Sequence, residues 1–206
     1  VLLVMVGPWV WPFEANEVNI RLRNQNPSWA HPFGTDQLGR DTFARMIAGG
    51  QTSISVGIAA MALSLTLGTL IGVAAGYYRR LDGVLMRFTD LFLSLPILPV
   101  LLVMMLLFRE PLSEAYGPEN GMFVLIVVSI GITSWMPTAR IVRGDVIALK
   151  EREFVLAARS IGTKDRQIIL RHILPNVLSP ILVSATLGIA NAIITESALS
   201  FLGLGF

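Results

Sequence analysis

The stretch ISVGIAAMALSLTLGTLIGVAAGYY, from Ile54 to Tyr78, decides the fold because it contains no charged residue. The hydrocarbon core of a bilayer is about 30 Å thick, and a helix needs roughly 20 mostly apolar residues to cross it. The stretch is long enough by that measure. We therefore expect it to be a membrane-spanning helix.

Three further stretches meet the same criterion. They are Leu91–Phe108, extendable back to about Val84, then Met122–Ala139 and Asn176–Thr195. The opening residues 1–13, VLLVMVGPWVWPF, are apolar but only about half long enough, so we interpret them as the end of a first span whose start is missing. The sequence predicts an all-α, polytopic transmembrane helical bundle with four full spans and one partial span.

Composition supports a membrane location. Hydrophobic residues make up 53% of the 206 residues and charged residues 15%, whereas soluble domains carry about 25% charged residues. The mean hydropathy is +0.66. No cysteine is present, which excludes disulfides and thiolate metal sites.

The basic residues predict the orientation, because Lys and Arg are retained on the cytoplasmic side of a membrane. Of the sixteen, five lie in residues 14–52 and 109–121. The other eleven lie in residues 79–87, directly after the first full span, and in residues 140–171, directly before the last one. The eleven are Arg79, Arg80, Arg87, Arg140, Arg143, Lys150, Arg152, Arg159, Lys164, Arg166 and Arg171. We expect residues 140–174 to be cytoplasmic, and residues 14–52 and 109–121 to face outward. The pI near 9.4 then reflects topology and not nucleic-acid binding.

A stripe of small residues recurs every four positions in the first full span. Its members are Ala60, Ser64, Gly68, Gly72 and Gly76. Small residues let membrane helices approach closely, so we expect the stripe to pack against another helix, with solute lining as the alternative.

Prolines and acids in the other spans give weaker signals. Pro96, Pro99 and Pro180 each remove a backbone donor and should bend their helices. Asp90 lies one turn after Arg87, which predicts a local ion pair. Glu196 lies about 30 Å along the helix from Pro175, near the outer boundary, and is a candidate for the solute pathway.

The segment 150–176 is the most informative one on the cytoplasmic side. Its residues Phe154, Ala157, Ala158 and Ile161 fall at helical spacing on one face. Gly162 is placed to end that helix in a left-handed conformation. Thr163 is then expected to cap a second short helix, with Asp165 in its first turn. The result is a helix–turn–helix that exposes two alanines, a surface suited to a partner that docks closely.

This segment resembles the EAA loop of ABC importer permeases, whose pattern is Glu-Ala-Ala, three residues, Gly, and about nine residues before Ile-x-Leu-Pro. Ala157, Ala158, Gly162, Leu174 and Pro175 are in register with that pattern. Two positions depart from it: Leu156 replaces the Glu, and Ile173 falls one place late. Leu156 carries no charge, so this position offers no charge-based contact.

A second motif, HPFGTDQLGRD at residues 31–41, looks like the dipeptide/oligopeptide branch of this family, which also includes nickel transporters. RHILPN at residues 171–176 and ESALSFLGLG at residues 196–205 resemble it as well. From the residues alone, residues 34–50 would be a turn and a short interfacial helix, and His31 a solvated histidine. The motif positions in the outer segment are Gly34, Thr35, Asp36, Gly39, Arg40 and Asp41.

The resemblance implies a type I ABC importer permease fold with six spans, of which this sequence holds about five. Residues 53–206 would form the permease domain, with a coupling loop at residues 150–175. The loop would contact cytoplasmic ATPase subunits. Its contact residues would be Glu153, Phe154, Ala157, Ala158, Arg159, Gly162, Leu174 and Pro175.

The resemblance also implies the partners and the location. We expect a second, homologous permease, an extracytoplasmic solute-binding protein, membrane lipid, and a bacterial or archaeal cytoplasmic membrane. The chain has no Gly-x-x-x-x-Gly-Lys-Ser/Thr loop, so we expect no cofactor here and no catalysis, with ATP and Mg²⁺ on the ATPase subunits. Solutes associated with such permeases are dipeptides, longer peptides, glutathione and nickel complexes.

Two other classes fit less well. An ion-coupled secondary transporter or channel would need ion-coordinating groups at mid-membrane, commonly in repeated halves, and the sequence has no internal repeat. An intramembrane enzyme would need its titratable groups together, but His31 and His172 are assigned to opposite sides of the membrane.

Overall fold

The computed structural model describes residues 1–205, which are mostly helical and contain no strand; Thr35 and Asp41 form one isolated antiparallel bridge. This confirms the expected all-α class. The chain divides into two compact units, Val1–Ser55 and Val56–Phe206. The helix α2 (Thr42–Tyr77) runs through the boundary between them.

The first unit contains α1 (Leu2–Val10), a short 3₁₀ turn η1 (Ile20–Leu22) and the start of α2. Two glycines bring α1 against the first turns of α2. A Cβ on Gly7 would lie 2.8 Å from the side chain of Ile47, and one on Gly50 would lie 2.9 Å from Val4. The apolar opening of the sequence is therefore helical, as expected.

The short helix expected within residues 34–50 begins at Thr42 and continues into α2 without a break. The 36 residues of α2 make a helix about 54 Å long, well beyond the thickness of a bilayer core. The expectation of a separate interfacial helix was wrong, because no proline or capping residue interrupts residues 42–77.

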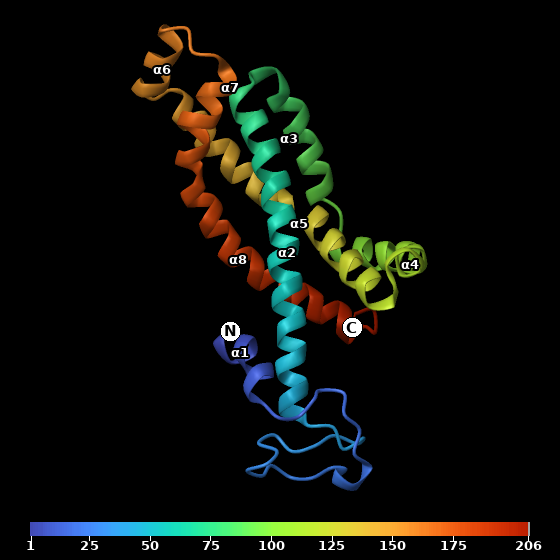
Figure 1. The fold of residues 1–206 in the computed structure, drawn as a ribbon. Helices are drawn as coiled ribbons and strands as arrows, with labels where there is room; N and C mark the ends of the chain where they lie inside the picture. Colours follow the sequence, from blue (N-terminus) through green and yellow to red (C-terminus); the bar gives the residue numbers. More distant parts are fainter. Residues whose placement is uncertain (206) are drawn as a thin grey trace. The chain divides into compact units, whose positions relative to one another are not determined.

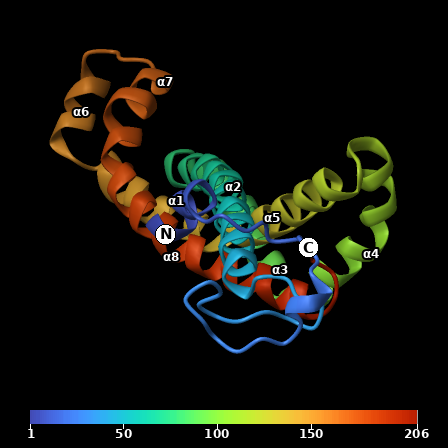
Figure 2. The same cartoon turned by 60° about the horizontal axis from the view of Figure 1, so that its bottom comes forward.

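The second unit is organised along α5 (Pro118–Lys150), which packs against α4 (Ile97–Tyr116) and α8 (Leu174–Phe201). The helix α3 (Arg79–Leu93) also contacts α5. Beyond α5 come α6 (Glu153–Ser160), α7 (Asp165–Ile168) and a π-helical turn, η2 (Ile169–Ile173), which leads into α8 (Figure 1). The helices α6 and α7 lie at one end of α5, and α4 lies at its other end (Figure 2).

Within residues 1–205, three helical segments are long and apolar enough to cross a membrane: Thr42–Tyr77, Pro118–Lys150 and Asp165–Phe201. The stretch expected as one span at Leu91–Phe108 is instead broken into α3 and α4, which meet at an angle of 84°. The break falls at residues 94–96 because Pro96 donates no hydrogen bond and disfavours a helical Leu95. Counting this pair as one span gives four.

The helices continue through the other two prolines, and a bend at either one stays a prediction. Pro99 lies in the first turn of α4, where backbone N–H groups have no helical partner, so the missing donor costs nothing. Pro180 lies inside α8, which continues through it to Phe201.

The small-residue stripe of α2 packs against α5, as predicted. Ala60 and Ser64 are fully buried. Cβ atoms added at Gly68 and Gly72 would lie 2.8 Å and 2.6 Å from the backbone oxygens of Trp135 and Ala139. At Gly76 the added atom would lie 2.7 Å from Val146 Cβ. The two backbones therefore touch over two to three helical turns, an approach that larger side chains would prevent.

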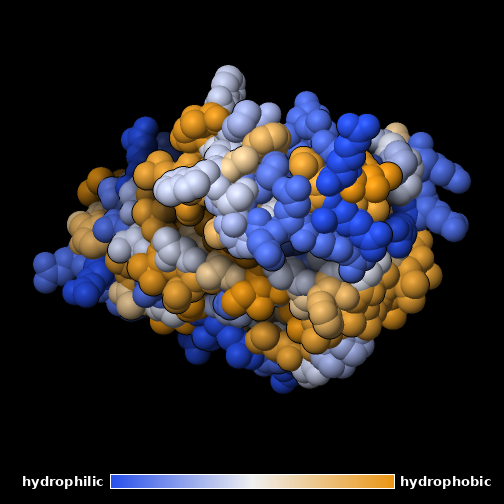
Figure 3. Space-filling view, turned by 90° about the horizontal axis from the view of Figure 1, so that it is seen from below, coloured by the Kyte–Doolittle hydropathy of each residue, from blue (hydrophilic) through white to orange (hydrophobic). Residues whose placement is uncertain are grey.

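Many large apolar side chains remain exposed. Figure 3 shows apolar patches beside polar ones on one face of the molecule. Examples on the second unit are Leu70, Val84, Leu91, Leu182 and Leu187, each more than 60% exposed. Soluble monomers rarely leave so much apolar surface in contact with water. The surface fits a protein surrounded by lipid or by other membrane helices.

We predict that Gly72→Ala destabilises the folded protein by about 1–3 kcal/mol, because the new methyl group would overlap a backbone oxygen of α5. The matched control is Gly144→Ala on α5, where an added Cβ meets nothing within 4 Å. That control should stabilise by about 0.4–1 kcal/mol. Thermal unfolding in detergent measures both, and equal melting temperatures for the two variants would contradict the packing.

Candidate functional site

The loop at residues 150–175 is fixed to the spans by an apolar cluster. From α6, Val155 and Ala158 are buried in it, and from the following turns Ile168 and Ile173 are buried as well. The cluster also takes in side chains of α2, α5 and α8, namely Val73, Tyr77, Val142, Val146, Val177 and Ile181. The loop is therefore packed on three long helices.

Gly162 ends α6 as the sequence predicted. Its φ is +81°, the left-handed conformation that favours glycine. The amide of Thr163 donates to the Ala158 carbonyl, and the amide of Gly162 donates to that of Arg159, which is the bond pattern of a Schellman cap. The cap predicted for Thr163 was wrong, since Lys164 precedes α7 and no side chain caps that helix.

Polar interactions join the loop to the end of α2. The hydroxyl of Tyr77 donates to Asp165 Oδ1 at 2.6 Å. The guanidinium of Arg159 lies 5.8 Å from the centre of the Tyr77 ring, and a hydrogen bond with Tyr77 raises the pKa of Arg159. Lys150 Nζ donates to the carbonyl of Gly76 at 3.2 Å. Arg159, predicted as a contact for a partner, thus also holds the loop in place.

The face of α6 that points away from the cluster is apolar and exposed. Phe154 is 43% exposed, Ile161 is 84% exposed, and Ala157 lies between them. Both alanines were expected on this face, but Ala158 is buried with Val155 on the adjoining side of the helix, about 100° round from Ala157. We call Phe154, Ala157 and Ile161 the α6 face.

The remaining residues predicted for the loop are Glu153, Leu174 and Pro175, of which Leu174 packs against the apolar cluster. Glu153 is exposed in the first turn of α6. Leu174 and Pro175 begin α8, where proline is tolerated because its position needs no donor. None of these placements tests the predicted contact with an ATPase.

Two ion pairs join α3 to the half of α5 nearest the loop. Arg140 Nη2 donates to Asp90 Oδ1 at 2.5 Å, and Arg143 Nη2 donates to Asp82 Oδ2 at 2.7 Å. The local pair predicted between Arg87 and Asp90 was wrong, because Arg140 on α5 pairs with Asp90 instead. Arg140 and Arg143, which the sequence analysis used only to predict the orientation, therefore also bind α5 to α3.

In the first unit, the motif at residues 34–41 forms a closed turn. Asp36 Oδ1 accepts the amides of Leu38 and Arg40, and Oδ2 accepts from the side chains of Arg40 and Arg45 at 2.8 Å. Burial would raise the pKa of Asp36, but the hydrogen bonds from Arg40 and Leu38 outweigh it and lower the pKa from 3.8 to about 2. Gly34 and Gly39 both have positive φ, and a side chain on either would overlap a neighbouring backbone carbonyl.

The same motif caps α2. Asp41 Oδ1 accepts the amide of Ala44 at 2.7 Å, the bond of an N-cap residue, and Asp41 Oδ2 lies 2.5 Å from His31 Nδ1. His31 is 6% exposed, and the centre of its ring lies 4.6 Å from that of Phe13, with the two rings tilted. The solvated histidine expected from the sequence is therefore buried, and it orients the capping carboxylate. Thr35 adds hydrogen bonds to Leu22 and Gln25.

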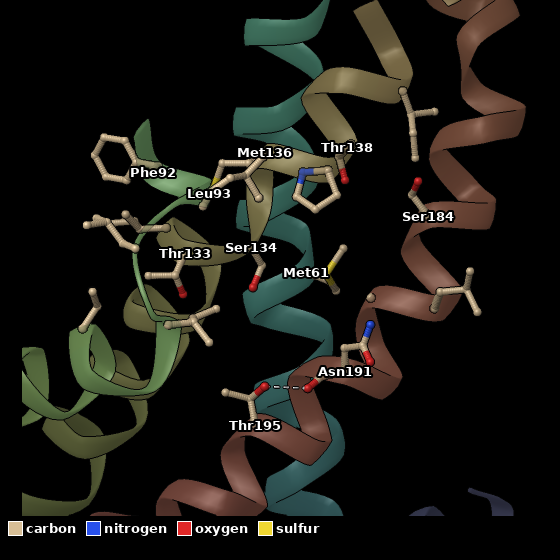
Figure 4. Close-up of a pocket in the computed structure, with 18 of the residues that line it drawn as sticks. Met61, Phe92, Leu93, Thr133, Ser134, Met136, Thr138, Ser184, Asn191 and Thr195 are labelled. Carbon is tan, nitrogen blue, oxygen red and sulfur yellow. Dashed lines mark hydrogen bonds between the residues drawn. The ribbon is translucent and has the colours of Figure 1, made fainter. Parts of the chain in front are cut away.

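A cavity of about 600 Å³ lies in the second unit between the α3–α4 break, α5 and α8, with Met61 of α2 in its wall (Figure 4). Most of its wall is apolar. The polar side chains that line it are uncharged: Thr133, Ser134, Thr138, Ser184, Asn191 and Thr195. Pro137 also lines it, and because Pro137 has no N–H, the carbonyl of Thr133 loses its usual helical donor.

Glu196, the candidate for the pathway, does not line this cavity. It is 4% exposed, and Ser200 Oγ donates to its Oε1 at 2.8 Å. Its predicted role remains a prediction.

Sequence reasoning missed the cavity and the Tyr77–Asp165 bond. A signal for the cavity was available: Asn191 is an amide within an otherwise apolar span, and Pro137 lies in the middle of another. The Tyr77–Asp165 hydrogen bond joins residues 88 positions apart, so no local sequence pattern indicates it.

Helices of membrane-spanning length are typical of an integral membrane protein. Residues 64–206 match the family described as "Binding-protein-dependent transport system inner membrane component". The chain belongs to this family. A Brucella suis protein provisionally named a peptide transport system permease protein is 40% identical over 206 residues, covering 100% of this chain and 66% of its own.

Two further relatives have more specific names. The oligopeptide transport system permease protein OppC of Haemophilus influenzae is 38% identical over 208 residues, covering 100% of this chain and 63% of its own length. The dipeptide transport system permease protein DppC of Bacillus subtilis is 38% identical over 205 residues, covering 99% of this chain and 61% of its own length. The chain thus spans slightly less than two thirds of the length of these relatives.

We predict that the Asp36 turn loses its stabilising effect in acid. The pKa of Asp36 is lower in the folded protein than in an unfolded chain, so its contribution is full above about pH 4 and declines toward pH 2. The melting temperature of the wild type should exceed that of Asp36→Asn at pH 6, and the gap should shrink between pH 4 and pH 2. A gap of constant size over this range would contradict the assignment.

Proposed function

We propose that this chain is the membrane-spanning permease subunit of an ATP-driven importer of peptides or similarly small solutes, working in a bacterial or archaeal cytoplasmic membrane. The observation that carries the proposal is the α6 face, an exposed apolar surface on a loop packed against three long helices. The family, and relatives whose names specify peptide, oligopeptide and dipeptide transport, support the choice of solute.

In this proposal the loop transmits force from a cytoplasmic ATPase to the spans. ATP and Mg²⁺ bind to the ATPase subunits, whose movement displaces α6. Because Val155 and Ala158 are embedded among side chains of α2, α5 and α8, displacement of α6 must move the ends of those helices. The Tyr77–Asp165 hydrogen bond adds a direct connection to α2.

The proposed complex has three further kinds of partner. A second, homologous permease and lipid cover the apolar surfaces of α3 and α8, where Leu91 and Leu182 are each more than 60% exposed. An extracytoplasmic binding protein delivers the solute on the side of residues 109–121. This chain contributes no catalytic group, and ATP hydrolysis takes place on the ATPase subunits.

The α6 face can be tested with two neighbouring alanines. In the complete complex in lipid vesicles, Ala157→Glu should abolish ATPase stimulation by loaded binding protein while leaving the melting temperature of the permease unchanged, because Ala157 is exposed. Ala158→Glu buries a carboxylate among apolar side chains and should lower the melting temperature itself.

Gln167→Glu is the matched control, since it adds the same carboxylate at an exposed position on α7. It should retain both stimulation and stability. Normal ATPase stimulation in Ala157→Glu would show that the α6 face is not the docking surface.

A further inference from the structure

The cavity between the α3–α4 break, α5 and α8 contains polar groups with no partner inside the protein. The side chains of Ser134, Thr138, Ser184 and Asn191 make no hydrogen bond within residues 1–205. In Figure 4, Ser134, Ser184 and Asn191 extend from α5 and α8 into the same space. Together they offer both donors and acceptors.

From their positions along apolar helices of membrane-spanning length, we expect these groups to lie within the hydrocarbon core. Ser134 is at the middle of α5, and Asn191 is about 22 Å along α8 from Asn176, within a bilayer core about 30 Å thick. An amide with unused donors in hydrocarbon is strongly unfavourable. The cavity therefore suits water or a polar solute better than lipid chains.

The chemistry of the wall specifies the kind of solute. Within the described part of the chain, no Asp, Glu, Lys, Arg or His lines the cavity, so it has no charge with which to select a charged side chain. Hydroxyl and amide groups match the N–H and C=O groups of a peptide main chain. Met61, Met104 and Met136 supply flexible apolar walls that adapt to different side chains. At about 600 Å³ the cavity falls within the usual size of small-molecule sites.

We propose that this cavity is a passage site that holds the main chain of a short peptide through Ser134, Thr138, Ser184 and Asn191, without selecting for side-chain charge. This inference rests on the proposed function and names the chemistry by which the solute is recognised. Without an opposite charge for the peptide termini the site binds weakly, as a transport path requires, since the solute must also leave.

The first test uses the absence of cysteine in the chain, which makes an introduced thiol unique. In the complete complex in vesicles, N-ethylmaleimide should label Asn191→Cys at least about tenfold faster than Leu182→Cys, because only thiols that water can ionise react. Leu182 is the matched control: it is 64% exposed on α8 but does not line the cavity. Loaded binding protein with ATP should slow labelling of Asn191→Cys alone. Equally slow labelling of both would show that lipid or a partner helix fills the cavity and would overturn the proposal.

The second test measures uptake of alanyl-alanine, alanyl-lysine and alanyl-glutamate. Asn191→Leu should reduce uptake of all three by about five- to tenfold, the effect of one lost hydrogen bond. Asn191→Asp should raise the ratio of alanyl-lysine to alanyl-glutamate uptake at least about fivefold over wild type, because it adds a negative charge to a neutral wall. Thr186→Leu, on α8 outside the cavity, should behave as wild type.

The outcomes separate the two proposals. Absence of ATP-dependent peptide uptake by the wild-type complex would overturn the proposed function. Normal wild-type uptake with unchanged rates and ratios in both Asn191 variants would overturn the passage site alone.

Discussion

The close contact of α2 with α5 is the constraint on which the rest of the second unit depends. Between Gly68 and Gly76 the two backbones approach so closely that a methyl group at three successive stripe positions would overlap α5. In lipid there is no hydrophobic force between helices, so such packing must supply much of the association. The contact places Tyr77 beside the loop and Trp135 beside the α3–α4 break. The loop at residues 150–175 and the cavity thus share one supporting helix pair.

Much of this fold could be predicted from local pattern. The stripe at four-residue spacing indicated a packed helix face, and Gly162 indicated the end of α6, because each depends on a residue type with a strict steric role. The basic residues predicted an orientation with residues 140–174 on the cytoplasmic side, and that orientation stays a prediction. Motif positions identified the loop as the candidate coupling element, while its contact with an ATPase remains a prediction.

What could not be predicted depends on contacts distant in sequence. The run Leu91–Phe108 is uniformly apolar, so hydropathy could not reveal that Pro96 turns the chain by 84°. Helical spacing placed Ala157 and Ala158 together, but only the cluster beneath α6 decides which one is buried. His31 was read as solvated because its partner, Asp41, is apposed by a turn that the sequence does not specify locally.

Photo-crosslinking from the α6 face tests the central claim most directly, because the claim is that this surface docks on an ATPase. A benzophenone amino acid would replace Ile161, which is 84% exposed, or Leu182 on α8 as the control. In native membranes, the account predicts a crosslink from position 161 to an ATP-hydrolysing subunit and none from position 182. Crosslinks to lipid or to other permease segments only, from both positions, would contradict it.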